Sequence, residues 1–327
     1  MKATSMKSVL FGRHGKTLAA SLLGCALLAP AVHAWTKTEA TPAPAVAAKA
    51  PPTPLLWKVS DRDNAIYLLG SFHLLKADDY PLSTDVDRAF ERAGKVVFEV
   101  PPAELTDPAL ALKMQQLAGY ADGRTLSQVL PPDVREKMAQ VLGAERLAQL
   151  DPIEPWFISL GLVIGVSQQL GFSPEYGLDM HLARRAAAAN KPVSGLETAD
   201  EQLRVLDASP MDEQVQGLRD YFTKPGEVPR QLNDTHVAWR NGDVKRLSAL
   251  AVDDVRKETP RTYRILNVER NNAWVPQLRQ MLDGSRKGDV LVVVGAMHLL
   301  GADGVVEQLR AKGYKVERIC SACRAPK

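Results

Sequence analysis

The chain has 327 residues, of which 45% are hydrophobic and 24% charged, and its mean hydropathy is −0.16. This composition is typical of a globular protein with a large core, and it excludes a wholly disordered or collagen-like chain. The formal net charge of +3 arises from the first 34 residues, which hold four basic residues and no acid, whereas the remainder has 37 basic and 38 acidic residues. Because the chain after residue 34 is nearly neutral, its charge gives no reason to expect nucleic acid as a partner.

Residues 1–34 have the features of a secretory signal peptide. Basic residues up to Lys16 precede a short apolar stretch ending at Pro30, and the small-x-small sequence Ala-Val-His-Ala ends at Ala34. The stretch is shorter than the roughly 20 apolar residues of a membrane span, and cleavage is expected after Ala34. We therefore predict a periplasmic or secreted protein with no transmembrane span in the mature chain. The alternative is a lipoprotein anchored through an acylated Cys25.

Residues 35–54 are rich in Ala, Pro, Thr and Lys and contain almost nothing large to bury. This composition predicts an extended linker, after which the folded domain begins near Leu55. Two apolar runs, 55–59 and 65–70, enclose a turn of Ser, Asp, Arg, Asp and Asn. The pattern predicts a β-hairpin.

Strands and helices are expected to alternate after the hairpin. Ser83 is placed to cap a helix, and the β-branched run 96–100 predicts a strand that ends at Pro101. Residues 108–150 have helical, amphipathic patterns, and the apolar segment 156–170 predicts a buried helix too short to span a bilayer.

The second half of the chain continues the alternation. Further predicted elements are a helix at 176–190, a strand at 191–196, helices over 198–284, a strand at 289–294, a helix at 304–312 and a strand at 314–319. A strand–helix–strand order argues for an α/β fold, and we expect one domain over 55–319 with a mixed central sheet flanked by many helices.

The C-terminal tail, residues 320–327, carries the two cysteines of the expected mature chain. Cys320 and Cys323 form a C-x-x-C sequence. In an oxidising compartment this pair is expected to close a local disulfide. The alternative, a redox-active dithiol, requires a helix N-terminus or a βαβ setting that this tail does not provide.

One local pattern occurs twice, each time at the end of a predicted strand. Gly-Ser-Phe-His-Leu-Leu ends at Leu75 and Gly-Ala-Met-His-Leu-Leu ends at Leu300, so His73 and His298 occupy matched positions. Open α/β sheets bind ligands at the carboxyl ends of their strands. Histidine is also the commonest metal ligand, so the matched pair predicts a site, although each histidine alone would more often be a satisfied core residue.

Glu99 belongs to the same argument because it stands among Val and Phe residues of a predicted strand. Burying a carboxylate is costly unless a cation or hydrogen-bond donors meet it. Two imidazoles and one carboxylate are a reasonable ligand set for Zn²⁺, Mn²⁺ or Co²⁺. The alternative is that Glu99 points to solvent from a half-exposed strand.

These and further motifs resemble the TraB/GumN family, whose animal relatives are the Tiki metalloproteases. The resemblance covers 55–319 and rests on eight blocks in matching order: 55–60, 67–73, 97–99, Tyr-Gly-Leu-Asp at 176–179, Gly-Leu-Glu-Thr at 195–198 with Gln202, Ala-Trp-Arg-Asn-Gly-Asp at 238–243, Glu-Arg-Asn at 269–271, and 294–299. It implies an erythromycin-esterase/ChaN-like fold and a metal-dependent hydrolase scaffold. By position, it implies that His73 and His298 are metal ligands and that Glu99 is a ligand or a base.

Four other matched residues are further candidates for the site, and two of them have an alternative role. Arg270 binds a substrate carboxylate or oxyanion, or else forms an ion pair with a nearby acid. Asp179, Glu197 and Asn271 are candidates for orienting a ligand or contacting substrate, and Asp179 is alternatively a helix cap. Two other histidines, His181 and His236, are expected to be structural or exposed, and the 238–240 block is expected to pack a helix while leaving its guanidinium exposed.

We therefore expect an exported, metal-dependent, peptidase-like hydrolase that uses a metal-activated water. Its catalytic residues are Glu99 and Arg270, and its substrate is a peptide or another small molecule of the cell envelope. The alternative is a non-catalytic periplasmic protein that binds metal or haem, or an accessory protein of the envelope or of exopolysaccharide production, on the same scaffold.

Overall fold

The computed structural model describes residues 49–284 and 288–323. The predicted signal peptide, Cys25 and residues 35–48 of the predicted linker lie outside the described residues. The structure contains a six-stranded sheet in the order β4-β3-β5-β2-β1-β6. The strands are β1 (Leu56–Ser60), β2 (Ala65–Ser71), β3 (Lys95–Phe98), β4 (Val193–Gly195), β5 (Val290–Gly295) and β6 (Lys315–Ile319).

The sheet is mixed. β2, β5, β3 and β4 run parallel, whereas β1 is antiparallel to both β2 and β6. The β1–β2 hairpin is confirmed, and the side chain of Asp61 accepts hydrogen bonds from the backbone N–H groups of Asp63 and Asn64 in its turn. Every residue of β2 and β5 is buried, as expected for adjacent parallel strands covered on both faces.

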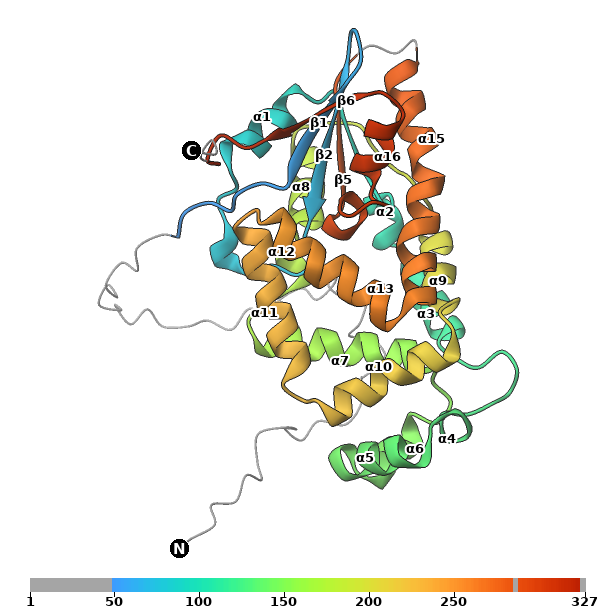
Figure 1. Ribbon diagram of the computed structural model, residues 1–327. Helices are drawn as coiled ribbons and strands as arrows, with labels where there is room; N and C mark the ends of the chain where they lie inside the picture. The colour runs from blue at the N-terminus through green and yellow to red at the C-terminus, as the bar shows by residue number, and fades with distance from the viewer. Residues whose placement is uncertain (1–48, 285–287, 324–327) are drawn as a thin grey trace, which may run out of the picture.

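Helices flank this sheet, and the predicted α/β class is therefore confirmed (Figure 1). Those beside the sheet are α1 (Thr84–Arg92), α8 (Leu178–Ala188), α15 (Arg270–Asp283) and α16 (Val305–Ala311). Ser83 caps α1 as predicted, because its side chain accepts a hydrogen bond from the backbone N–H of Asp85.

A helical half lies below the carboxyl ends of the strands in Figure 1. Its longer helices are α3 (Pro108–Leu117), α5 (Pro132–Leu142), α7 (Pro155–Gln169), α9 (Ala199–Asp207), α10 (Met211–Thr223) and α11 (Glu227–Arg240). Shorter ones are α2 (Pro102–Leu105), α4 (Leu126–Val129), α6 (Ala144–Gln149), α12 (Val244–Ser248), α13 (Asp254–Glu258) and α14 (Pro260–Tyr263). Single turns are η1 (Ala77–Asp79), η2 (Pro174–Tyr176) and η5 (Ala296–Leu299), and π-helical turns are η3 (Ala249–Asp253) and η4 (Arg264–Glu269).

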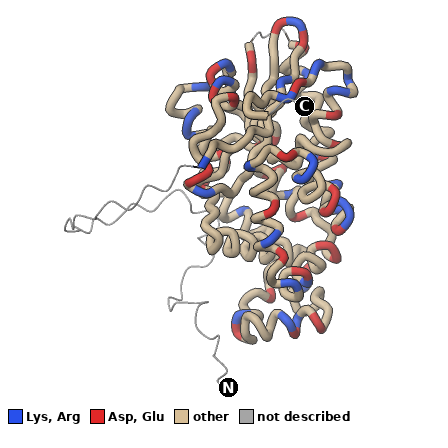
Figure 2. The backbone as a smooth tube through the Cα atoms, turned by 60° about the vertical axis from the view of Figure 1, so that its left-hand side comes forward, with Lys and Arg blue, Asp and Glu red and all other residues tan. Residues whose placement is uncertain are grey.

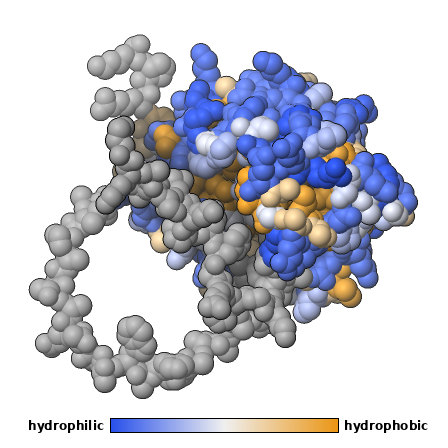
Figure 3. All heavy atoms as spheres, turned by 90° about the horizontal axis from the view of Figure 1, so that it is seen from below, coloured by the Kyte–Doolittle hydropathy of each residue, from blue (hydrophilic) through white to orange (hydrophobic). Residues whose placement is uncertain are grey.

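Each half has its own hydrophobic core. The larger core surrounds the sheet, and a second core in the helical half joins α4, α5, α7 and α10 through residues such as Leu126, Met138, Ile158 and Leu218. Basic and acidic residues alternate along the backbone in Figure 2 with neither sign gathered in one region, in line with the nearly equal numbers of the two after residue 34. Seen from below, an apolar area lies among the polar surface (Figure 3).

Two expectations about side-chain burial are wrong. The apolar α7 was expected to be buried, but only four of its residues are, because Ile158 and Leu162 pack into the second core whereas most of its other residues are only partly covered. The guanidinium of Arg240 was expected to be exposed, but its side chain is 15% exposed and forms an ion pair with the fully buried Asp79. No helix in residues 49–284 or 288–323 is long and apolar enough to cross a membrane.

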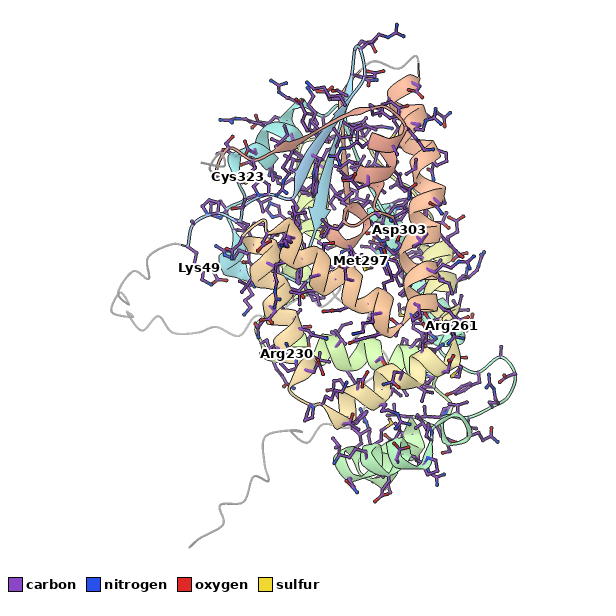
Figure 4. The ribbon with its side chains drawn as sticks, in the orientation of Figure 1. Lys49, Arg230, Arg261, Met297, Asp303 and Cys323 are labelled. Carbon is purple, nitrogen blue, oxygen red and sulfur yellow. A yellow bond between two sulfur atoms is a disulfide. The ribbon has the colours of Figure 1, made fainter. Side chains whose placement is uncertain are left out.

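The two ends of the described chain are fixed to the domain. Pro52 and Pro54, in the predicted linker, are buried, and the side chain of Lys49, which is labelled in Figure 4, forms an ion pair with Asp78. At the other end, Cys320 and Cys323 are joined by a local disulfide directly after β6, and Ser321 between them donates to the carboxylate of Asp85 through its backbone N–H and its hydroxyl.

Candidate functional site

The parallel strands bring four predicted site residues to one edge of the sheet. His73 follows β2, Glu99 follows β3, Glu197 follows β4, and His298 lies on η5 directly after β5. The strand β3 ends at Phe98, two residues earlier than the predicted run 96–100, so Glu99 lies at the carboxyl end rather than within the strand. The sequence therefore places these side chains where open α/β sheets bind ligands.

The imidazole of His73 is held through one nitrogen. Its Nδ1 lies 2.7 Å from the Oδ2 atom of Asp179, which also accepts a hydrogen bond from the hydroxyl of Ser71 at 2.5 Å. The negative charge of Asp179 raises the pKa of His73 to about 9, against the effect of burial. The His73 side chain is 60% exposed, so it forms the open side of the site. Asp179 does not cap α8, because Gly177 occupies the N-cap position.

The imidazole of His298 is held in the same manner by an amide. The side-chain N–H of Asn271 donates to the carbonyl of Asp303, so its Oδ1 atom is the acceptor that faces the Nδ1 of His298 at 2.8 Å. This contact leaves the Nε2 atom of His298 without a proton. Burial lowers the pKa of His298 to about 3, so the ring is neutral at pH 7. Its side chain is only 4% exposed.

Glu99 lies between the two imidazoles. Its Oε1 atom is 4.0 Å from the Nε2 of His73 and 3.9 Å from the Nε2 of His298, and it accepts the backbone N–H of Gly295 at 2.6 Å. Burial on its own raises the pKa of Glu99, but His298, Arg270 and His73 outweigh it and lower the pKa to about 2. The carboxylate is therefore ionised throughout the neutral range.

Gly295 keeps the space among these three side chains open. A Cβ atom at this position would lie 3.1 Å from the Nε2 of His73 and 3.2 Å from the Oε1 of Glu99. Contacts that short force the neighbouring atoms to move, so any side chain here would fill the point toward which both imidazoles and the carboxylate are directed.

Arg270 joins the carboxylates on the other side of Glu99. Its guanidinium donates to Glu197 at 2.6 to 3.2 Å, to the Oε2 of Glu99 at 2.7 Å, to the carbonyl of Leu266 at 3.2 Å and to the Nε2 of His298 at 3.0 Å. These contacts use all five of its N–H donors. Arg270 therefore forms ion pairs with nearby acids, which was the second of its two predicted roles. A substrate oxyanion would have to displace one of these acceptors.

The residues fit a divalent metal in kind and orientation. Each imidazole has its Nδ1 held by an oxygen and its Nε2 directed at Glu99, which is the usual setting of ligating histidines. Two ligands about 2.1 Å from one ion in tetrahedral arrangement lie about 3.4 Å apart. The gaps to Glu99 are wider than that, and in the described ranges no group of three or more His, Cys, Asp or Glu is arranged to hold a metal ion.

The site includes residues to which the sequence assigned no role. The amide of Gln202 on α9 donates to both Glu99 and Glu197, at 3.2 and 3.3 Å. The indole of Trp274 lies 4.5 Å from the ring of His298 and 4.7 Å below the guanidinium of Arg270. The spacing of Trp274, four residues after Arg270 on one helix, was the only sequence signal for that contact.

Two further histidines of the described residues, His181 and His236, make contacts of their own outside the His73–Glu99–His298 group. The ring of His181 stacks on Tyr80 at 4.4 Å, and burial lowers its pKa to about 4. His236 is buried, with its Nε2 atom 2.8 Å from the carboxylate of Asp79. Asp79 also accepts from Arg240, so this buried triad supports the chain segment that follows His73.

Comparisons with known proteins point to one family. A family model described as the TraB/PrgY/gumN family matches residues 55–318. The uncharacterised protein YbaP of Escherichia coli and that of Shigella flexneri are each 27% identical over 245 residues, which cover 75% of this chain and 87% of YbaP. The metalloprotease TIKI1 of Danio rerio is 22% identical over 312 residues, which cover 80% of this chain and 62% of TIKI1. No solved structure matches. The family match spans most of the chain, and the protein belongs to the TraB/PrgY/gumN family.

Proposed function

We propose that the protein is a metal-dependent hydrolase that cleaves amide bonds in a peptide. The observation that carries this proposal is the convergence of two imidazole Nε2 atoms on one oxygen of Glu99, with an open space kept by Gly295. The likeness to TIKI1, a metalloprotease, supports peptide hydrolysis as the reaction class.

In this proposal His73, His298 and Glu99 hold the ion, which is Mn²⁺, Co²⁺ or Zn²⁺. The bound ion supplies an activated water at neutral pH. Asp179 and Asn271 orient the two imidazoles so that each presents Nε2. His73 is the exposed member, so substrate approaches from its side.

Glu99 serves better as a ligand than as a general base. A base works best when its pKa lies near the operating pH, whereas the pKa of Glu99 is about 2. Arg270 and Gln202 fix the second oxygen of this carboxylate, so its first oxygen stays directed at the imidazoles. Arg270 therefore positions the ligand set, and it stabilises a substrate oxyanion only after giving up one of its present acceptors.

We also propose that the protein acts outside the cytoplasm, on a peptide or another small substrate of the cell envelope. This part rests on the first 34 residues alone. Sequencing the N-terminus of the purified mature protein tests it. Trp35 as the first residue supports cleavage after Ala34, and an acylated Cys25 establishes the lipoprotein alternative.

A second candidate function is a non-catalytic accessory protein on the same scaffold, one that binds metal or haem or no ligand. The saturated donors of Arg270 favour it, because the guanidinium already neutralises Glu99 and lies 3.0 Å from the Nε2 of His298. In that case the cluster is a buried ion-pair network that stabilises the fold.

One experiment separates the two functions. Metal content is measured on the purified mature protein, and hydrolysis of a quenched fluorescent peptide mixture is followed with added Mn²⁺ or Co²⁺. We expect about one ion per chain and activity that His73→Ala and His298→Ala both abolish, whereas the control His181→Ala retains it. Activity that persists in either site variant contradicts the mechanism, and tight metal binding without hydrolysis supports the accessory function.

A further inference from the structure

A second group of titratable side chains lies at the N-terminal end of α7. Glu154 precedes this helix, and Asp207 is the last residue of α9. The side chain of Gln214 connects the two segments, because it accepts the backbone N–H of Trp156 at 3.0 Å and donates to the carbonyl of Ser209 at 2.7 Å. Each carboxylate is two residues from one of these contacts, and the charge of Asp207 acts on Glu154, so the two carboxylates lie in one region of the structure.

Neither carboxylate has a basic side chain at ion-pair distance within the described ranges. Arg124, which acts on Glu154 from further away, is itself paired with Asp122. Burial raises the pKa of Glu154, and the charge of Asp207 raises it further. Burial likewise raises the pKa of Asp207. A cationic group between them would offset both effects.

Unpartnered polar groups lie in the same place. Trp156 is 8% exposed, and its indole N–H is directed at Asp207 closely enough to lower that carboxyl's pKa, yet it has no acceptor at hydrogen-bond distance among the described atoms. The hydroxyl of Tyr120 is also buried without a partner, and Glu154 raises its pKa in addition to burial. A bridge between Gly119 and Ile153 brings Tyr120 to this position. Buried groups without partners are costly, so they mark a place for a polar ligand.

An apolar stripe on α7 leads away from this group. Ile158 and Leu162 face α10, and the opposite side of the helix carries Phe157, Leu160 and Ile164. These three are half-exposed, and none belongs to or packs against a buried cluster of the described residues. A helix that is apolar all round is normally buried, so the partly exposed apolar side of α7 favours contact with a further partner.

The stripe runs past the candidate active site. The N-terminal end of α7 is tied to the segment after α9 through Gln214, and its C-terminal end leads to Ser173, which pairs with Leu75 two residues after His73. In Figure 1, α7 crosses below the strand ends. On α9, Gln202 contacts Glu99, and Asp207 follows it five residues later. Five residues of helix span about 7.5 Å, which is roughly the length of two residues of extended peptide.

We propose that an extended peptide substrate binds along α7, with a cationic nitrogen held by Glu154 and Asp207. Its apolar side chains contact the stripe of Phe157, Leu160 and Ile164. A peptide fits better than an acyl chain, because one residue with an amino group offers both a cation for the carboxylates and a carbonyl for the N–H of Trp156. The inference rests on the proposed peptide hydrolysis.

Binding of three labelled peptides to the full mature chain tests this proposal by fluorescence anisotropy, with a chelator present so that no hydrolysis occurs. The probes carry a C-terminal fluorophore on Ala-Leu-Ala-Leu-Ala-Leu with a free amino terminus, on its N-acetylated form, and on an N-acetylated form that begins with lysine. We expect a cationic probe to bind about ten-fold or more tightly than the uncharged one. Preference for the first or the third probe identifies the amino terminus or a lysine side chain as the source of the charge.

Variants assign the effect to these residues. Glu154→Gln with Asp207→Asn is expected to remove the preference for the cationic probe, whereas Glu145→Gln, an exposed acid on α6, keeps it. Leu160→Ser is expected to weaken all three probes, and Leu112→Ser, at a residue 59% exposed, serves as its control. If circular dichroism shows that the double variant is unfolded, either single variant must reduce the preference.

The proposal is overturned if the three probes bind alike, if none binds, or if the preference survives in the variants. Its failure is distinct from failure of the proposed function. A preference for the cationic probes without metal binding or hydrolysis supports the subsite and contradicts the proposed hydrolase. Hydrolysis without any charge preference supports the hydrolase and contradicts the subsite.

Discussion

Arg270 is the cation on which the buried carboxylates depend, and replacing it is the sharpest test of that network. The side chains of Arg270, Glu99 and Glu197 are 10%, 9% and 8% exposed. Arg270→Met removes the guanidinium and leaves both carboxylates buried with their permanent counter-charge gone. Removing one partner of a buried pair typically costs about 3–5 kcal/mol, and we expect a loss of unfolding free energy in that range.

The assay is urea unfolding at pH 7, followed by far-UV circular dichroism with a chelator present. The double variant Glu197→Gln/Arg270→Met leaves one buried carboxylate without a cation instead of two. It should be about 1–2 kcal/mol more stable than Arg270→Met alone. Arg230→Met, in an exposed pair with Glu227, should change the free energy by less than about 1 kcal/mol. A loss below about 1 kcal/mol for Arg270→Met, or a double variant less stable than the single one, refutes the argument.

Two further predictions concern single residues. Asp79→Asn should destabilise the protein by about 3 kcal/mol at pH 7, because it removes the buried carboxylate that contacts the Nε2 atom of His236. Burial favours a raised pKa at Asp79, but its partners lower it from 3.8 to about 2. That contribution is complete above pH 3.8 and is lost as the pH falls through about 2, so unfolding curves of variant and wild type should converge there and at no higher pH. Gly295→Ala should weaken Mn²⁺ binding, measured by calorimetry, about ten-fold or more while the melting temperature changes little, because its methyl group fills the space beside Glu99; unchanged affinity would mean that no ion binds there.

In the proposed function, the two imidazoles serve as one substrate-facing and one internal ligand, and their settings differ accordingly. His73 is exposed and held by a carboxylate, whereas His298 is buried, neutral and held by an amide. A neutral Nε2 in a dry setting binds a cation without first releasing a proton. The open side of the site therefore belongs to His73, toward which the α7 stripe leads.

The strand ends were predictable from local sequence because their signals are local. The β-branched run before Glu99 and the apolar run before Gly295 each predict a strand, and parallel strands necessarily bring their carboxyl ends to one edge. The matched His73 and His298 therefore marked the site before any contact was known, although their roles there remain a prediction.

The contacts that fill the site were not predictable in the same way. Arg270 and Glu197 are 73 positions apart in the sequence. Nothing local in either segment shows that the guanidinium donates its hydrogen bonds to acidic side chains of the protein instead of to a substrate. The half-exposure of α7 was missed for a related reason, because hydrophobicity shows that a helix can be buried but not which neighbours cover it. The burial of Arg240 likewise depends on Asp79, which reaches it from a distant segment.

The central claim is that His73, His298 and Glu99 hold one ion, and a crystal structure of the protein soaked in Mn²⁺, with data collected at the manganese absorption edge, tests it most directly. The account predicts a single anomalous peak within about 2.0–2.3 Å of both Nε2 atoms and of the carboxylate, with the guanidinium of Arg270 moved away from His298. A map with no peak there, while that guanidinium still contacts the Nε2 of His298, would contradict it.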